Sequence, residues 1–262
     1  MGDIKDFEIV DGVLIKYHGK ESEVVVPEGV TVIGDKAFFE CYDIDSIVLP
    51  DGVTQIGYRA FSGCLCRRIV LPQSITTIGK EAFYVCEYLD SISIPDSVEY
   101  IGDKAFSYCR YLTSITCFKT LNPNKNYKSI DGNLYTKDGK TLVSYAVGKL
   151  KHEFVVPNSV KNIGAFAFHG CEELYEISMP RGVKTIGEGA FAECVNLNTI
   201  VLPNSVSNIG EGAFFYCMSI VDFKLDEGNK NYQLIDGNLY TKDGKILVAC
   251  LAGYDDTELI RK

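Results

Sequence analysis

Cysteine is the residue type with the widest chemical range in this 262-residue chain, which contains ten of them. A thiolate can attack a substrate, pair in a disulfide or bind zinc. Seven cysteines each stand three residues after the Phe of an Ala-Phe pair: Cys41, Cys64, Cys86, Cys109, Cys171, Cys194 and Cys217. No Cys-x-x-Cys pair accompanies a matched pair of histidines, so the sequence does not support a zinc site. The common spacing instead indicates a structural repeat.

Histidine is the usual base for a nucleophilic Ser or Cys, and the chain has three: His18, His152 and His169. We match His169 to the position of Tyr108 and Glu193 in other copies of the repeat, and we expect an exposed turn residue there. His18 and His152 occur in or beside hairpin segments and have no recurring acid partner. We therefore expect no catalytic residues, and hence a protein that is not an enzyme.

Two other patterns could do chemistry but have simpler explanations. The adjacent carboxylates of Glu172-Glu173 and Asp255-Asp256 are typical of solvated turns, because an acid/base pair must be placed across a substrate. Gly187-Glu188-Gly189 belongs to the repeat and lacks the features of a phosphate-binding loop. The sequence predicts no metal and no cofactor.

Charge and hydropathy narrow the classes of partner. The formal net charge is -9 and the pI is about 4.9, without a run of Lys or Arg. This excludes the usual modes of binding to nucleic acid and to anionic lipid. The longest apolar stretch, around residues 246–252, is too short to span a membrane, so we expect no membrane insertion.

The elements that position the cysteines recur with a period of about 23 residues. Pro27, Pro50, Pro72 and Pro95 are 23, 22 and 23 positions apart, and the spacing of 23 resumes from Pro157. Each proline follows a short segment of alternating apolar residues, such as 89–94, which predicts a strand with one buried face. A unit this short cannot bury its own core, so successive units must stack as coils.

The second half of each unit predicts a change of direction followed by a buried aromatic. In one copy, Gly102 permits a sharp turn, and residues 103–106 suit a single helical turn that directs Ala105 and Phe106 inward. The cysteines then form internal ladders of buried free thiols, each filling a small apolar slot and bonding weakly to a backbone carbonyl. Cys66, Cys117 and Cys250 lie outside this register.

Two matching segments, residues 126–143 and 231–248, interrupt the repeats 105 positions apart, and a looser version opens the chain. Each predicts a β-hairpin, with the tight primed turn at Asp138-Gly139 or Asp243-Gly244. Turn formation explains these Asp residues better than calcium binding, because the alternating ligands and distal Glu of a calcium loop are missing. The second hairpin is either a C-terminal cap or a junction to a further stack.

The predicted organisation is a single solenoid over residues 1–262. Its parts are an N-terminal hairpin cap (1–23), a first repeat stack (24–121), a β-hairpin insertion (122–153), a second repeat stack (154–225) and a C-terminal hairpin unit (226–262).

The repeat resembles the BspA-type leucine-rich repeat. The pattern I-x-[I/L]-P-x-x-V-x-x-I-G-x-x-A-F-x-x-C is read directly in residues 92–109. The resemblance implies a repeat solenoid of the leucine-rich-repeat class, a right-handed, β-rich coil with parallel strand stacks. It also implies bacterial or protozoan surface proteins, some of which adhere to host matrix glycoproteins. The implied location is the cell surface or secreted, or the cytoplasm if no leader was removed.

The outward-facing residues of the predicted strands form the candidate protein-binding face. They are Ser46, Val48, Arg68, Val70, Ser91, Ser93, Ser114, Thr116, Glu176, Ser178, Thr199 and Val201, continuing to Asp222 and Lys224. We expect a monomer that is adhesin-like and binds a protein or glycoprotein through this face. The alternative is an intracellular scaffold, which the free cysteines favour. These residues could also be ordinary solvent-facing strand positions.

Overall fold

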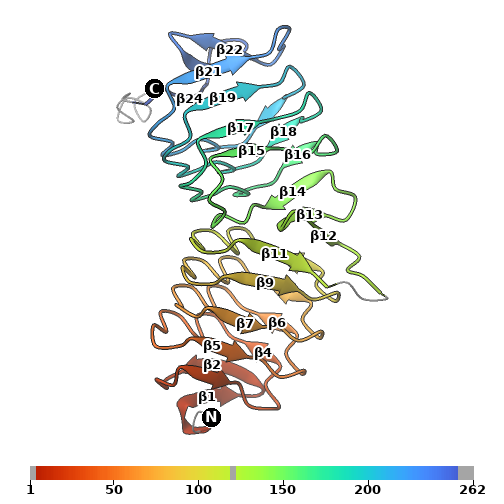
Figure 1. The fold of residues 1–262 in the computed structure, drawn as a ribbon, viewed down its shortest axis with the longest axis vertical. Helices are drawn as coiled ribbons and strands as arrows, with labels where there is room; N and C mark the ends of the chain where they lie inside the picture. The colour runs from red at the N-terminus through yellow and green to blue at the C-terminus, as the bar shows by residue number, and fades with distance from the viewer. Residues whose placement is uncertain (1–3, 119–121, 253–262) are drawn as a thin grey trace. The chain divides into compact units, whose positions relative to one another are not determined.

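A computed structural model describes residues 4–118 and 122–252. The chain divides into two compact units, unit 1 (residues 1–138 and 144–149) and unit 2 (residues 139–143 and 150–262). In each unit, strands from successive coils lie side by side (Figure 1).

Unit 1 contains two stacks of parallel strands, one for each extended segment of the repeat. The first stack comprises a three-stranded sheet and a pair: β3 (Glu23–Val25), β5 (Ser46–Val48) and β7 (Arg68–Val70), then β9 (Ser91–Ile94) and β11 (Ser114–Cys117). The second stack follows a 3-10 turn (Ile4–Asp6) and begins with an antiparallel hairpin: β1 (Phe7–Val10), β2 (Val13–Tyr17), β4 (Val32–Ile33), β6 (Gln55–Ile56), β8 (Thr77–Ile78) and β10 (Tyr100–Ile101). A second hairpin, β12 (Tyr127–Ile130) and β13 (Asn133–Thr136), follows β11.

Unit 2 repeats this arrangement. Its first stack is β15 (Glu153–Val155), β17 (Glu176–Ser178), β19 (Thr199–Leu202) and β21 (Asp222–Leu225). Its second stack is β14 (Thr141–Ser144), β16 (Asn162–Ile163), β18 (Thr185–Ile186) and β20 (Asn208–Ile209). The hairpin sheet is β22 (Tyr232–Ile235), β23 (Asn238–Thr241) and β24 (Leu247–Ala249). The β-rich solenoid with parallel strand stacks is therefore confirmed.

A column of stacked phenylalanine rings fills the interior of each unit. In unit 1, the Phe83 ring lies 5.3 Å from Phe61 and 5.6 Å from Phe106, with interplanar angles of 2° and 7°. In unit 2, Phe191 is stacked between Phe168 at 4.9 Å and Phe214 at 5.6 Å. The Ala-Phe pair of each repeat thus supplies one ring of a continuous aromatic core.

The predicted helical turn takes a different form. Ala105 N–H bonds to Gly102 O and Ser107 N–H to Lys104 O, so the segment is a series of i→i+3 turns. Lys104 and Tyr108 have φ angles of 57° and 60°, and this alternation with left-handed residues prevents an α-helix from forming. No α-helix occurs among residues 4–118 and 122–252.

This alternating backbone joins each coil to the next. Every second N–H group in the turn segment points forward and donates to a carbonyl one repeat later. At the first junction, the bonds run from Lys36 to Tyr58 (2.9 Å), from Phe38 to Ala60 (2.7 Å) and from Glu40 to Ser62 (2.9 Å). The coils are therefore held together by a third hydrogen-bonded row beside the two strand stacks.

Gly102, which precedes the turn segment, was expected to permit a sharp change of direction, but the structure gives a different reason for glycine at this position. Gly102 is not in the left-handed region, so it does not supply the change of direction. A Cβ at Gly102 would instead lie 2.4 Å from the backbone nitrogen of Lys80 in the preceding coil. The equivalent Gly210 would place a Cβ 2.4 Å from the nitrogen of Glu188. Close approach of successive backbones therefore selects glycine here.

The hairpins are confirmed, but their tight primed turns lie at an earlier Asp-Gly pair. In the second hairpin, Asp236 and Gly237 have φ angles of 50° and 79° between directly paired strands. The expected position, Asp243-Gly244, belongs to a four-residue loop in which Thr241 N–H bonds to Ile246 O. Only Gly244 of that pair has a left-handed φ, so the primed turn was predicted at the wrong Asp-Gly.

All ten cysteines are free thiols, and the expected bonds to carbonyl oxygens are present for Cys86, Cys109, Cys194 and Cys217, whereas Cys41 is half-buried. Cys86 Sγ donates to Phe61 O and Cys109 Sγ to Phe83 O, both at 3.0 Å, and Cys217 Sγ donates to Phe191 O at 3.0 Å. Burial raises the pKa of Cys109 to about 12, because a thiolate would be desolvated there.

We therefore predict that stability falls in alkaline solution. The unfolded thiol ionises near its ordinary pKa while the folded thiol stays neutral, so the Cys109 contribution is complete below that value and is lost as pH rises toward about 12. Between pH 8 and 10, Cys109 should account for about 1 kcal/mol of the fall in unfolding free energy. Urea titrations of wild type and Cys109→Ala across this range measure the difference. Equal slopes for the two proteins would contradict the prediction.

Candidate interaction surface

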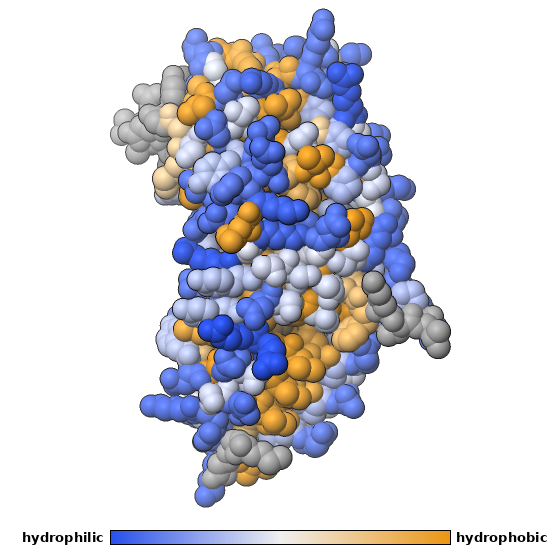
Figure 2. All heavy atoms as spheres, viewed as in Figure 1, coloured by the Kyte–Doolittle hydropathy of each residue, from blue (hydrophilic) through white to orange (hydrophobic). Residues whose placement is uncertain are grey.

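The strand face of unit 1 carries an exposed column of valines. Val25, Val48 and Val70 are in direct register on β3, β5 and β7, because their strands pair in parallel one repeat apart. Their exposed fractions are 45%, 41% and 55%. Figure 2 shows hydrophobic side chains gathered over β5 and β7 on this face of unit 1. The apolar column is thus available to a partner.

The same face becomes polar on β9 and β11. Ser93 Oγ and Thr116 Oγ1 are 2.9 Å apart and occupy paired register positions. The β12–β13 hairpin covers the far edge of β11, where Ile115 N–H donates to Gly132 O. Ser114 and Thr116 are half-buried, whereas Ser91 and Ser93 are exposed. The accessible part of the face therefore runs from β3 to β9.

The equivalent face of unit 2 is acidic along one column. Glu153, Glu176, Thr199 and Asp222 are in register on successive strands. Lys224 Nζ lies 3.4 Å from Asp222 Oδ2, so one of these carboxylates is partly neutralised. The unit 2 face thus differs from the unit 1 face in charge.

Of the twelve predicted face residues, eight are exposed and four half-buried. The exposed ones are Val48, Arg68, Val70, Ser91, Ser93, Glu176, Ser178 and Val201, and the half-buried ones are Ser46, Ser114, Thr116 and Thr199. The prediction omitted the first strand of each stack, where Val25 and Val155 are exposed. Because residues 24–26 are all valine, the alternation of buried and exposed positions in this strand is not visible in the sequence. The repeat spacing of 23 residues to the next strand would have identified Val25 as an outward-facing residue.

Sequence reasoning also missed an aromatic edge beside the unit 1 face. The rings of Tyr88 and Tyr111 stack at 5.5 Å and are 38% and 57% exposed. The Arg67 guanidinium lies 5.6 Å from the centre of the Tyr88 ring, and its Nε is 3.4 Å from Asp45 Oδ1. Both tyrosines stand two residues after a repeat cysteine, and this shared spacing would have predicted that their rings lie side by side in successive coils. Tyr and Arg are the side chains most enriched at energetic centres of protein interfaces.

Comparison with known families accounts for this architecture. The profile of the BspA type leucine rich repeat region matches six copies, over residues 16–132 and 145–241. The chain is a BspA-type leucine-rich-repeat protein.

Two solved structures have a similar fold. A leucine-rich repeat protein from Eubacterium ventriosum is 28% identical with a TM-score of 0.67, covering 81% of this chain and 65% of that one. The pneumococcal vaccine antigen PcpA is 22% identical with a TM-score of 0.60, covering 80% of this chain and 63% of that one. The BspA-type chain thus spans just under two thirds of these two structures. Comparison with curated proteins gave no match.

Two histidines of this BspA-type protein lie beside carboxylates. His18 Nε2 lies 3.1 Å from Glu8 Oε2, with both side chains exposed to solvent. His169 was expected to be exposed but is 3% exposed, 3.7 Å from Glu193 Oε1. The register was wrong by one residue: His169 is equivalent to Ser107, which is also buried, and not to Tyr108. Burial between coils follows from that position.

In the described part of the chain, no group of three His, Cys, Asp or Glu side chains is placed to hold a metal ion. Within residues 4–118 and 122–252, no helix has the length and apolar character needed to cross a bilayer.

Proposed function

We propose that this BspA-type protein is a non-enzymatic, adhesin-like module that binds a protein or glycoprotein through its exposed strand face. The observation that carries the proposal is the exposed column of Val25, Val48 and Val70. Arg68 begins the strand that ends at Val70, and the Tyr88–Tyr111 pair lies just before β9 and β11. An exposed apolar patch with a polar rim is typical of a contact surface. The edge supplies the aromatic and guanidinium groups that dominate binding energy at such surfaces.

The framework also favours binding by a broad surface. The three valines are β-branched and held on paired strands, so ordering them on binding costs little conformational entropy. A row of shallow side chains suits an extended protein or glycan better than a small molecule, which needs enclosure. The acidic column of unit 2, with Glu153 and Glu176, adds a preference for a basic partner region.

The cell surface, or secretion, is the location we propose, because BspA-type proteins are expected there. A second candidate is an intracellular scaffold, and the ten free thiols are the observation that favours it. Free buried thiols persist most readily where the compartment is reducing. The two candidates differ in the partner that they require, so a binding experiment separates them.

The test is capture by wild type and by the double variant Val48→Ser/Val70→Ser, each offered host matrix glycoproteins and a cytosolic lysate. We expect capture of a matrix glycoprotein, with affinity weakened on the order of tenfold or more in the variant because the apolar column is lost. The unfolding free energy should change by about 1 kcal/mol, since about half of each side chain is already exposed.

Ile246→Ser is the matched control, since Ile246 is 62% exposed on the hairpin of unit 2 and lies off the strand face. It should bind as wild type does. Capture from the lysate alone would replace the adhesin with the scaffold. Equal affinity of the double variant and wild type would contradict binding through this face.

A further inference from the structure

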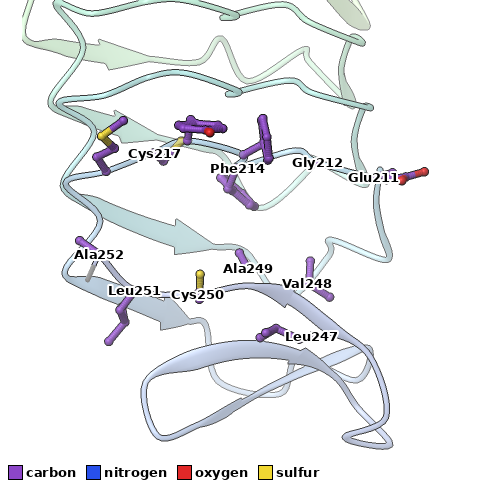
Figure 3. Close-up of a pocket in the computed structure, with 13 residues that line it drawn as sticks. Glu211, Gly212, Phe214, Cys217, Leu247, Val248, Ala249, Cys250, Leu251 and Ala252 are labelled. Carbon is purple, nitrogen blue, oxygen red and sulfur yellow. The ribbon is translucent and has the colours of Figure 1, made fainter. Parts of the chain in front are cut away.

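Unit 2 contains a pocket of about 700 Å³ between its last coil and the β24 segment. Phe214 and Cys217 line one side, and Val248, Ala249 and Cys250 line the other. Figure 3 shows Cys250 on the segment that faces the coil carrying Phe214 across this space. No residue of the strand face lines the pocket, so a ligand in it is distinct from the binding proposed for that face.

A row of backbone donors opens into this pocket. At the preceding junction, Gly189, Phe191 and Glu193 donate forward to carbonyls of the last coil at 3.0, 2.8 and 2.7 Å. The equivalent donors of the last coil are the N–H groups of Gly212, Phe214 and Tyr216. Over the residues that the structure describes, these three groups have no hydrogen-bond acceptor, and all three residues line the pocket. A ligand there gains by presenting acceptor oxygens.

The matching segment of unit 1 indicates what fills such a slot. Ala146 N–H donates to Asn133 Oδ1 at 3.1 Å, and Leu251 N–H donates to Asn238 Oδ1 at 2.9 Å, 105 positions later. The residue before each anchored N–H is Tyr145 in the first copy, and Cys250 in the second.

Tyr145 is buried to 1% exposure, so its ring fills the interior of unit 1. Cys250 is much smaller and only half-buried, and the pocket lies where the second copy lacks an aromatic ring. The coil below is correspondingly less covered, because Phe214 is 7% exposed and the equivalent Phe106 is 2% exposed. Unit 2 therefore has a mostly apolar pocket, and one residue that lines it, Cys250, stands in place of Tyr145.

We propose that this pocket binds an aromatic side chain carried by a partner polypeptide. The ring takes the place that Tyr145 takes in unit 1, and backbone carbonyls of the same segment accept hydrogen bonds from Gly212, Phe214 and Tyr216. At the rim, Phe215 and Met218 are 53% and 61% exposed and add apolar contact for the residues that flank the ring.

The test titrates the full chain with two probes, the blocked pentapeptides acetyl-Gly-Gly-Tyr-Gly-Gly-amide and acetyl-Gly-Gly-Ala-Gly-Gly-amide. Binding is followed by NMR at the amides of Gly212, Phe214 and Tyr216. We expect the Tyr peptide to bind with millimolar affinity, at a ratio of one to one, and to shift these amides. The Ala peptide should bind at least about tenfold more weakly, since it leaves the slot unfilled.

Cys250→Tyr should abolish binding because the chain then fills its own slot, while Cys250→Ser keeps the slot and should bind within about threefold of wild type. Tyr145→Cys should open an equivalent slot in unit 1 and raise the ratio of peptide to protein toward two. Protection of Cys250 from alkylation by the Tyr peptide gives a second readout that needs no variant.

Three results would overturn the binding of an aromatic side chain in this pocket. They are equal binding of the two peptides, undiminished binding to a folded Cys250→Tyr variant, and no change in the three amides or in Cys250 alkylation at high peptide concentration. If the free phenol 4-hydroxyphenylacetamide binds as tightly as the Tyr peptide, the ligand is a small aromatic molecule and the polypeptide partner is wrong.

Discussion

Phe83→Ala is expected to lower the free energy of unfolding by about 3–5 kcal/mol. Phe83 is fully buried, and its ring is stacked on both Phe61 and Phe106. The substitution removes the burial of an aromatic side chain and leaves a cavity in the middle of the aromatic column. The coils cannot collapse into this cavity, because hydrogen bonds fix their separation along three rows. Urea unfolding followed by circular dichroism measures the change.

Phe39→Ala is the matched control. Phe39 directly follows the core Phe38, but its side chain is half-buried and lies outside the column. Its loss should cost below about 1 kcal/mol. If Phe83→Ala cost no more than this control, the phenylalanine column would not be the core of the repeat.

Gly102→Ala is expected to cost about 2–4 kcal/mol, although it adds a single methyl group. The new Cβ would lie 2.4 Å from the nitrogen and 2.7 Å from the Cα of Lys80. Both atoms belong to the backbone of the preceding coil, so no side chain can move aside and the coils must separate. Separation strains the hydrogen-bonded rows on both sides of the junction. Thermal and urea unfolding of the variant measure the cost.

Gly52→Ala provides the control, because a Cβ at Gly52 meets one atom only, Val30 O at 3.3 Å. It should change stability by no more than about 1 kcal/mol. A stable Gly102→Ala variant, close to this control, would mean that glycine is not selected there by close approach of the coils.

The sequence was sufficient to predict the stacked coils because the constraint is repeated. Each Ile-x-Ile segment and each Ala-Phe-x-x-Cys segment meets its own copy one repeat later, so one physical solution explains every coil. The thiol–carbonyl bond of Cys86 followed from the same regularity.

Features that depend on backbone detail could not be obtained in this way. The role of Gly102 is visible only once the distance to Lys80 is known, because glycine serves both turns and close contacts. The left-handed φ of Lys104 has no sequence signal, since the equivalent residues include Arg59, Glu81 and Phe166. A shift of one residue in matching His169 was enough to place a buried side chain on the surface.

The candidate surfaces, too, were predictable in part from the repeat and in part only from the structure. The outward positions of β5 and β7 follow from strand alternation, but the accessibility of Ser114 depends on a hairpin that covers β11. At the pocket of unit 2, the second copy carries Cys250 where the first copy carries Tyr145. The difference between Tyr145 and Cys250 could be read from the sequence. The backbone N–H groups that line the pocket without an acceptor among the described residues could not be predicted from it.

Site-specific photo-crosslinking tests binding through the strand face most directly. A p-benzoylphenylalanine is placed in turn at position 70, on β7 in the valine column, and at position 55, which is exposed on β6 in the other stack. Each protein is irradiated with host matrix glycoproteins, and adducts are identified by mass spectrometry. We expect a glycoprotein adduct from position 70 and none from position 55. An adduct from position 55 without one from position 70 would contradict binding through the strand face.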